Sequence, residues 1–331
     1  MGTRIDYTKY SKVNPLSVVK DMDRTLENYK SLGKDYKIYD FEISTRNIPI
    51  CVLSHEYNPS RSKFLKHLLN QNVERKYFIF VYENQKEKYK DFKNVIYIPD
   101  SEYQLGLAQK RNKVLEFARQ NNYKDIFMIE DDCFNFCLPV GYQHEGKVVY
   151  KPFKVNYDLF FDIWEDIINK NELKFSGLDQ NTSFAFRIKD NLINEYANLC
   201  QCVHINLDMN LNYDITSGWD DWDFNLQVFV NKFKNGNIHL SYFTPALRDG
   251  ISVESNSLNK LKERCIKNST LLINKWGDFL VSKDERKDLF NARPNTRGIK
   301  QIIELNLNPK DFIQINKEKA KEILKEAKCQ N

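Results

Sequence analysis

The sequence lacks the features that usually attach a chain to a membrane or export it. It contains no run of about 18 or more apolar residues, the length that a membrane-spanning helix needs. Its opening residues, MGTRIDYTKYSKVNP, contain no apolar stretch typical of a secretory signal. They also lack the Ser or Thr that myristoylation requires, because Asp6 stands at that position. We therefore expect a cytoplasmic protein with no membrane partner.

The seven cysteines are not spaced like those of a zinc knuckle. Cys133 and Cys137 form a CxxxC pair and Cys200 and Cys202 a CxC pair, but the usual C-x2-C spacing is missing. An odd number of cysteines without a secretory signal indicates reduced thiols. We expect them to be buried as small hydrophobic side chains. A zinc site made from these four is the alternative.

The chain also has little excess charge of either sign. It carries 50 basic and 45 acidic residues, a formal charge of +5. This permits a polyanionic partner without requiring one, because binding depends on how the positive charge is clustered. Hydrophobic residues at 41% and aromatic residues at 13% suffice for a packed core. A chain of 331 residues can form one large α/β domain with additions, or two small domains.

Apolar runs alternate with amphipathic stretches from about residue 46. The strand-like runs are IPICVLS, YFIFVYE, VIYIPD and DIFMIE, and the helix-like stretches are RSKFLKHLLNQ and GLAQKRNKVLEFARQNN. This alternation predicts a single doubly wound, Rossmann-like α/β sheet. Its first strands are nearly continuous apolar runs, as is typical of buried parallel strands.

The remaining sequence suggests how the domain is extended. LFFDIWEDIINK is helix-like, LINEYANLCQCVHINLDMN resembles a helix running into a strand, and TSGWDDWDFNLQVFVNKFKNG predicts an acidic loop and a helix that ends at Gly236. We predict a helical N-terminal extension at 1–45, a main domain at 46–250 that divides into 46–140 and 141–250, and a helical, basic C-terminal region at 251–331.

Three consecutive carboxylates, Glu130, Asp131 and Asp132, follow the apolar run of DIFMIEDDCF. Ligands of doubly wound sheets bind beyond the carboxyl ends of the strands. This would place the triplet around one crevice with Ser54-His55 and Glu83-Asn84, which follow the earlier strands. An ordinary polar cap of a strand end is the alternative.

A second acidic cluster, WDDWD, begins at Trp219. A hard cation such as Mg2+ or Mn2+ prefers oxygen ligands and leaves room for substrate phosphates, so the first cluster can hold a metal and a nucleotide diphosphate. A carboxylate of the second cluster can act as general base on an acceptor hydroxyl. Trp219 and Trp222 suit stacking against a sugar or a base. For Asp220 and Asp221, the alternative is stabilisation of a helix N-terminus.

Together, these motifs resemble those of GT-A-type glycosyltransferases. The resemblance covers about residues 48–250 and rests on ICVLSHEYNPSR, GLAQKRNKVLEFA, IEDDC and GWDDWDFNLQ. More narrowly, the set resembles the TET/JBP-associated glycosyltransferases of phages and eukaryotes, which are thought to add sugars to oxidised or hydroxymethylated pyrimidines in DNA. The resemblance implies a GT-A-like fold with an acceptor-side extension and a helical C-terminal part.

The resemblance also implies roles for individual residues. Asp221 matches the base of inverting members, and Asp220 replaces the usual Glu beside it. The implied metal ligands are Asp132, Asp131 and His239, although a strand histidine with satisfied hydrogen bonds is the alternative for the last. Nucleotide-sugar contacts are implied for Ser54, His55, Arg61, Gly106, Arg111, Asn112, Glu130 and Asp131.

For Arg111 and for a group of basic residues near the C-terminus, the sequence leaves more than one role open. A helix N-terminus with an Arg is a natural anion site, which suits Arg111, although a surface charge is the alternative. Asp223 is expected to be structural. Arg293, Arg297 and Lys300 can contact an acceptor phosphate backbone or the donor diphosphate, or can be solvated surface charges.

We therefore predict a hexosyl- or pentosyltransferase that uses Mn2+ or Mg2+ and a UDP-sugar, with inversion of configuration. The implied acceptor is double-stranded phage DNA carrying a modified base such as 5-hydroxymethylcytosine, in the host cytoplasm during infection. One alternative is transfer to a cell-surface polysaccharide or a protein. Enzymes of that kind often attach to membranes through a basic amphipathic tail. The C-terminal stretch KEKAKEILKEAK of this chain is basic and predicted to be helical, but it has too few bulky apolar residues to insert into a membrane. Another alternative is a non-catalytic nucleotide- or DNA-binding module.

Overall fold

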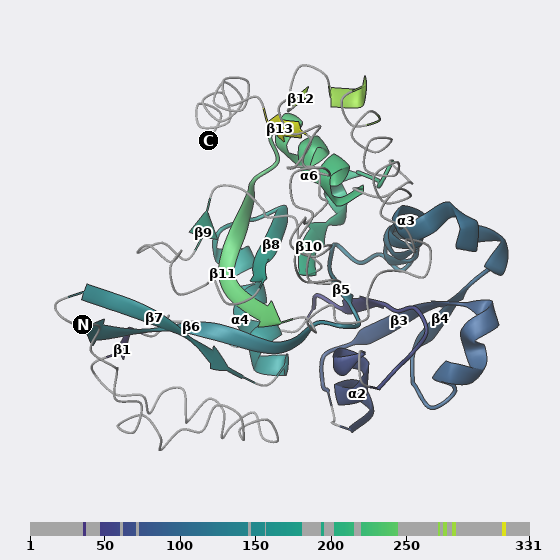
Figure 1. Ribbon diagram of the computed structural model, residues 1–331, viewed down its shortest axis with the longest axis horizontal. Coiled ribbons are helices and arrows are strands. Elements are labelled where there is room, and N and C mark those ends of the chain that lie inside the picture. Colours follow the sequence, from purple (N-terminus) through teal and green to yellow (C-terminus); the bar gives the residue numbers. More distant parts are fainter. Residues whose placement is uncertain are drawn as a thin grey trace, which may run out of the picture. The chain divides into compact units, whose positions relative to one another are not determined.

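The apolar runs of the sequence form the strands of one large sheet. In the sheet the strands follow the order β1-β6-β11-β8-β10-β5-β2-β3-β4, with β7 paired to β6 and β9 paired to β11 (Figure 1). The computed structural model describes residues 36–37, 47–59, 62–70, 73–144, 147–155, 157–180, 193–194, 202–214, 220–243, 271, 274–276, 280–282 and 313–315.

The elements have the following bounds. The strands are β1 Tyr36–Lys37, β2 Ile50–Leu53, β3 Tyr77–Tyr82, β4 Val95–Ile98, β5 Asp125–Glu130, β6 Phe134–His144, β7 Lys147–Lys154, β8 Phe175–Gln180, β9 Ile193–Asn194, β10 Cys202–Asn206, β11 Asn235–Phe243, β12 Leu280–Ser282 and β13 Ile313–Ile315. The α-helices are α2 Lys63–Asn70, α3 Gly106–Gln120, α4 Tyr157–Lys170 and α6 Asp220–Val230, and the 3-10 helices are η2 Glu83–Tyr89, η3 Asp100–Leu105 and η4 Leu207–Met209.

The chain divides into two compact units that alternate along the sequence. Unit 1 consists of residues 1–97, 121–208 and 234–244, and unit 2 of residues 98–120, 209–233 and 245–331. Unit 1 therefore contains the large sheet up to Tyr97 with α2 and α4, and unit 2 contains η3, α3, α6, β12 and β13. The domain boundaries at residues 45, 140 and 250 stay a prediction.

The half of the sheet that the sequence predicted best is parallel. β2 pairs in parallel with β3 on one side and with β5 on the other. All four residues of β2 are buried, which explains why a near-continuous apolar run is required there. The expected α/β class is thus confirmed, and the acidic triplet lies at the carboxyl end of a parallel strand.

Beyond β5 the sheet is mixed. β10 runs antiparallel to both β5 and β8, whereas β11 runs parallel to β8. β6 and β7 form a long antiparallel hairpin, from Cys137 opposite Lys154 to His144 opposite Lys147. Sequence analysis did not identify this hairpin, and it placed Ile193 and Asn194 in a helix, which is wrong because they form β9 and pair with β11.

The predicted helix end at Gly236 is also wrong. α6 ends at Val230, and Gly236 lies in β11. The side-chain Nδ2 of Asn231 donates to the carbonyl of Gln227 (2.8 Å). Lys232 adopts a positive φ of 59°, and the backbone amide of Phe233 donates to the carbonyl of Val228 (3.1 Å). These bonds satisfy the last carbonyls of the helix without a glycine.

The C-terminal region was expected to be helical. Its described residues include helical Leu271 and Asn274–Trp276, and also the small antiparallel pair of β12 and β13. Within the described ranges, no helix is both long and apolar enough to cross a lipid bilayer.

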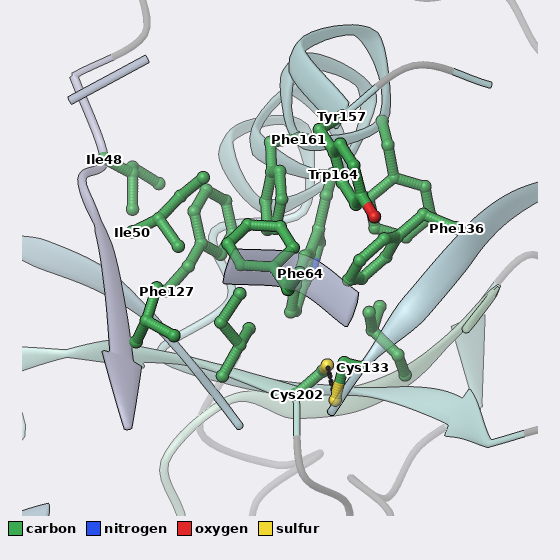
Figure 2. Packing of buried hydrophobic residues seen from close by; sticks show 14 of the residues in the cluster. Ile48, Ile50, Phe64, Phe127, Cys133, Phe136, Tyr157, Phe161, Trp164 and Cys202 are labelled. Atoms are coloured by element: carbon green, nitrogen blue, oxygen red, sulfur yellow. Dashed lines mark hydrogen bonds between the residues drawn. The ribbon is translucent and has the colours of Figure 1, made fainter. Parts of the chain in front are cut away.

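The core of unit 1 lies between α4 and the sheet and combines aliphatic side chains with a group of packed aromatic rings. Phe64 of α2 meets Tyr157 edge-on at 4.8 Å between ring centroids, and Phe127 of β5 lies 4.5 Å from Trp164 of α4 (Figure 2). Such ring pairs add stabilisation beyond the area they bury. Cys51, Cys133, Cys137 and Cys202 are buried, as expected, whereas Cys200, Cys265 and Cys329 lie outside the described residues.

A buried arginine joins α4 to the parallel half of the sheet. Arg75, just before β3, is 1% exposed and contacts two carboxylates of α4, Asp162 at 2.6 Å and Glu165. It also donates to the carbonyl of Ile48 (2.9 Å). Since a buried charge is costly unless it is paired, these partners are required for Arg75 to lie inside the core.

We expect Arg75→Met to lower the free energy of unfolding by about 3–5 kcal/mol, because it leaves two carboxylates buried without their cation. Urea unfolding measures the loss. The matched control is Lys90→Met, which removes an exposed cation after η2. Replacing Arg75, Asp162 and Glu165 together by Met, Leu and Met should recover much of the stability, since no buried charge remains. An Arg75→Met protein as stable as the control would contradict this account.

Candidate functional site

The carboxylate of Asp131 is held between the ends of β2 and β5 by hydroxyl groups. Its Oδ2 atom accepts hydrogen bonds from the Oγ atoms of Ser54 (2.5 Å) and Ser62 (2.7 Å). The Ser54 Oγ in turn lies 2.6 Å from the hydroxyl of Tyr89, which is fully buried. Burial is the main cause that raises the pKa of Tyr89, so its hydroxyl is neutral at physiological pH. Asp131 is therefore the acceptor at the centre of a short chain of hydroxyl groups.

Backbone contacts fix Asp131 further. Its amide donates to the carbonyl of Leu53 (3.1 Å), and its carbonyl accepts from the amide of Phe64 in the first turn of α2 (3.2 Å). Ser62 directly precedes Lys63 as the N-cap residue of α2, since its carbonyl accepts the first helical hydrogen bond, from the amide of Lys66 (3.0 Å). Asp131 thus connects β5, β2 and the N-terminus of α2. Sequence analysis missed Ser62 and Tyr89, although a Ser before an apolar helical stretch is a recognisable helix start.

Asp132, the next residue, lies in a strongly negative environment. Burial, together with the charges of Glu130 and Asp131, raises the pKa of the Asp132 carboxyl to about 7. A cation near this group would relieve that unfavourable environment.

A metal ion at this strand end would have few protein ligands. Across the described ranges, no group of three or more His, Cys, Asp or Glu side chains is arranged to hold a metal ion. Mg2+ commonly binds one or two carboxylates and completes its coordination with water and substrate phosphates, and Asp132 fits that kind of site. The set Asp131, Asp132 and His239 stays a prediction. The side chain of His239 lies outside the described residues, although its backbone belongs to β11.

The loop after β2 contacts the segment after β3. The Nδ1 of His55 lies 2.9 Å from the Nε2 of Gln85, and the amide of Glu56 donates to the Oε1 of Gln85 (3.1 Å). Together with the contact between Ser54 and Asp131, this confirms that the ends of β2, β3 and β5 lie at the same edge of the sheet. Nucleotide binding by Ser54, His55 and Glu130 stays a prediction.

Unit 2 contains the second acidic cluster, at the start of α6. Asp220 forms an ion pair with Arg111 of α3 at 2.7 Å, and their side chains are 5% and 8% exposed. Arg111 is therefore not a surface charge. The preceding Gly106, at which α3 begins, has a φ of 79°, a value that favours glycine. Asp221 is partly exposed, in contrast to Asp220.

The neighbour of Arg111 also has a structural contact. The Asn112 side chain donates to the carbonyl of Tyr213 (2.9 Å) and accepts from its amide (2.8 Å). The Tyr213 ring lies under the guanidinium of Arg111 (5.3 Å) and stacks on Phe224 of α6 (4.4 Å). These contacts join α3, residue 213 and α6 inside unit 2. Donor binding by Gly106, Arg111 and Asn112 stays a prediction.

The remaining predicted residues cannot be placed by their side chains. Arg61, Trp219, Arg293, Arg297 and Lys300 lie outside the described residues. Trp222 belongs to α6, but its side chain lies outside them too.

We expect a double-mutant cycle of Ser62→Ala and Asp131→Asn to give a coupling energy of about 1.5–3 kcal/mol, because hydrogen bonds to charged groups contribute about that much. Urea unfolding of the four proteins measures it. Ser101→Ala, at an exposed residue of η3, serves as control and should change stability little. If the effects of Ser62→Ala and Asp131→Asn simply add, Asp131 is not held by Ser62 as described.

The chain was compared with known proteins. No curated protein matches it. Among solved structures, it is similar to "Mannosyltransferase PcManGT from Pyrobaculum calidifontis in complex with GDP-Man and Mn2+", with 10% sequence identity and a TM-score of 0.44 over 86% of this chain and 76% of that chain. At this score the likeness does not decide donor, metal or fold.

A comparison with models of protein families identifies the family of this chain. The model described as TET-Associated Glycosyltransferase matches residues 48–235, which include the acidic triplet at the end of β5 and all of α6. The match spans more than half of the 331 residues. The chain therefore belongs to the TET-associated glycosyltransferase family and is a glycosyltransferase.

Proposed function

We propose that the protein transfers a sugar from a UDP-sugar to the hydroxyl group of a hydroxymethylated pyrimidine in DNA, with the help of a divalent cation. The observation that carries this proposal is the family match over a segment in which Asp132 follows a parallel strand and Asp221 lies at a helix start. The family's association with TET points to modified pyrimidines as acceptor. Phage DNA in the cytoplasm of an infected cell is the setting that this acceptor suggests.

Asp132 is the residue that would hold the cation on the donor side. Its raised pKa reflects burial and two neighbouring carboxylates, so a divalent cation would stabilise its charged form. When bound, Mn2+ or Mg2+ neutralises the charge that develops on the leaving diphosphate. Asp131 orients this strand end through Ser54 and Ser62. Ligands of parallel α/β sheets bind at such strand ends, which supports a nucleotide there.

Asp221 is the proposed general base. Its neighbour Asp220 is already paired with Arg111, whereas Asp221 is partly exposed. In the reaction, the acceptor hydroxyl oxygen forms a bond to the anomeric carbon and the bond from that carbon to the UDP oxygen breaks. UDP leaves with the bonding electrons, and Asp221 takes the hydroxyl proton. Attack opposite the leaving group inverts the configuration.

The acceptor base has to leave the base stack to reach a carboxylate, because a stacked base is enclosed by its neighbours. Trp219 and Trp222 are the proposed stacking partners, since base–aromatic stacking tolerates different bases. Arg293, Arg297 and Lys300 are the proposed contacts to the DNA phosphates.

The test offers the purified protein Mn2+, a panel of UDP-sugars, and DNA that contains either 5-hydroxymethylcytosine or cytosine. We expect a hexose or pentose mass shift on the hydroxymethylated nucleoside alone, measured by mass spectrometry. Asp221→Asn should lower kcat about 10²–10⁴-fold, because it removes the general base. Asp132→Asn should abolish the stimulation by Mn2+.

Asp208→Asn is the matched control, since Asp208 is an exposed carboxylate of η4, and its activity should equal that of the wild type. Release of UDP without modified DNA would reject DNA as acceptor and favour a polysaccharide or protein. If no UDP-sugar is turned over with either DNA, UDP is rejected as the donor nucleotide.

A further inference from the structure

Asp223 of α6 is a buried carboxylate with partners from three parts of unit 2. It is 0% exposed. Its Oδ2 atom accepts from the Nε2 of Gln227 (3.0 Å) and the amide of Asp214 (3.3 Å). Its Oδ1 atom accepts from the indole Nε1 of Trp276 (2.8 Å) and pairs with the Nζ of Lys275 (2.7 Å). Asp223 thus has a structural place, as its sequence context suggested.

The two partners at Oδ1 come from the C-terminal part of the chain. Lys275 also contacts the Oδ2 of Asp214 at 2.8 Å, so a single ammonium group joins α6 to the segment before it. Burial lowers the pKa of Lys275, but hydrogen bonds to Asp214 and Asp223 outweigh burial and raise it. Lys275 is accordingly charged and compensates the buried carboxylate.

These contacts bear on the first turn of α6. Asp220, Asp221 and Asp223 all belong to that turn. Asp220 is held by Arg111, and Asp223 is held by Lys275 and Trp276, so the backbone of Asp221 is restrained on both sides. Lys275 and Trp276 lie beyond residue 235, where the family match ends. A base must be held in a fixed geometry to act efficiently, and small displacements are costly.

We propose that Lys275 and Trp276 are positioning residues that fix the first turn of α6 through Asp223, and that the chain beyond the family match is therefore part of the acceptor-side catalytic unit. This proposal rests on the function proposed above for Asp221. In this proposal, neither Lys275 nor Trp276 contacts the reacting atoms. They act by holding the helix that carries the base.

The test uses the full-length variants Lys275→Met and Trp276→Phe. Each removes one donor to Asp223, and the second keeps an aromatic ring. We expect kcat for sugar transfer to fall roughly tenfold in each variant while the KM for the UDP-sugar is unchanged, because only the base is displaced. Lys275→Arg should retain most of the activity, since it keeps the charged donor. In parallel, hydrogen exchange followed by mass spectrometry should show faster exchange in a peptide that covers α6.

Lys174→Met is the matched control, because Lys174 is a partly exposed cation paired with Asp208 in unit 1. It should change neither kcat nor exchange in α6. Unchanged exchange in α6 of Lys275→Met and Trp276→Phe would overturn the proposal. Faster exchange with a wild-type kcat would also overturn it, since the contacts would then be structural only. Should the wild type transfer no sugar at all, the proposed function fails by itself, and the exchange experiment alone decides whether Lys275 and Trp276 fix α6.

Discussion

The parallel pairing of β2 with β5 is the constraint on which the arrangement around Asp131 depends. Leu53 lies opposite Glu130 in that pairing, so the next residues, Ser54 and Asp131, leave the sheet at the same edge. Their side chains are then close enough for a hydrogen bond, and the carbonyl of Asp131 meets the first turn of α2. A shift of one residue in this register would turn Asp131 to the other face of the sheet and separate it from both serines.

The same strands were the part of the fold that the sequence predicted well. Their apolar runs are uninterrupted because both faces of β2 are buried, and the amphipathic stretch of α3 is long enough to be unambiguous. The acidic triplet could be located for a related reason. Carboxylates that directly follow a buried strand must lie at the end of that strand. The alternation of strands and helices predicts a parallel sheet, so this end belongs to the carboxyl edge of the sheet.

The sequence did not predict features that depend on residues far apart. Nothing near Arg75 in the sequence indicates that its partners, Asp162 and Glu165, lie 87 and 90 positions away on α4. The strand β10 was foreseen, but its antiparallel insertion between β5 and β8 depends on pairing that no local pattern encodes. The contacts of Asp223 with Lys275 and Trp276 are of the same kind.

The end of α6 was predicted wrongly for a local reason that can be learned. α4 and α6 end in the same way: an Asn side chain bonds the carbonyl four residues earlier, and the next residue, Glu172 or Lys232, has a positive φ. The hydrophobic residue that follows, Leu173 or Phe233, donates its amide to a carbonyl five residues back. Asn-X-hydrophobic therefore ends both helices here, where a search for glycine finds no stop.

The alternation of the two units along the chain limits how the gene can be divided. The polypeptide passes from one unit to the other after residues 97, 120, 208, 233 and 244. Neither unit is a continuous stretch of the gene, so no single break or fusion can remove one and leave the other whole. Segments distant in sequence must also meet before either unit is complete, which slows folding relative to units built from local contacts. A deletion that removes one unit therefore also interrupts the other.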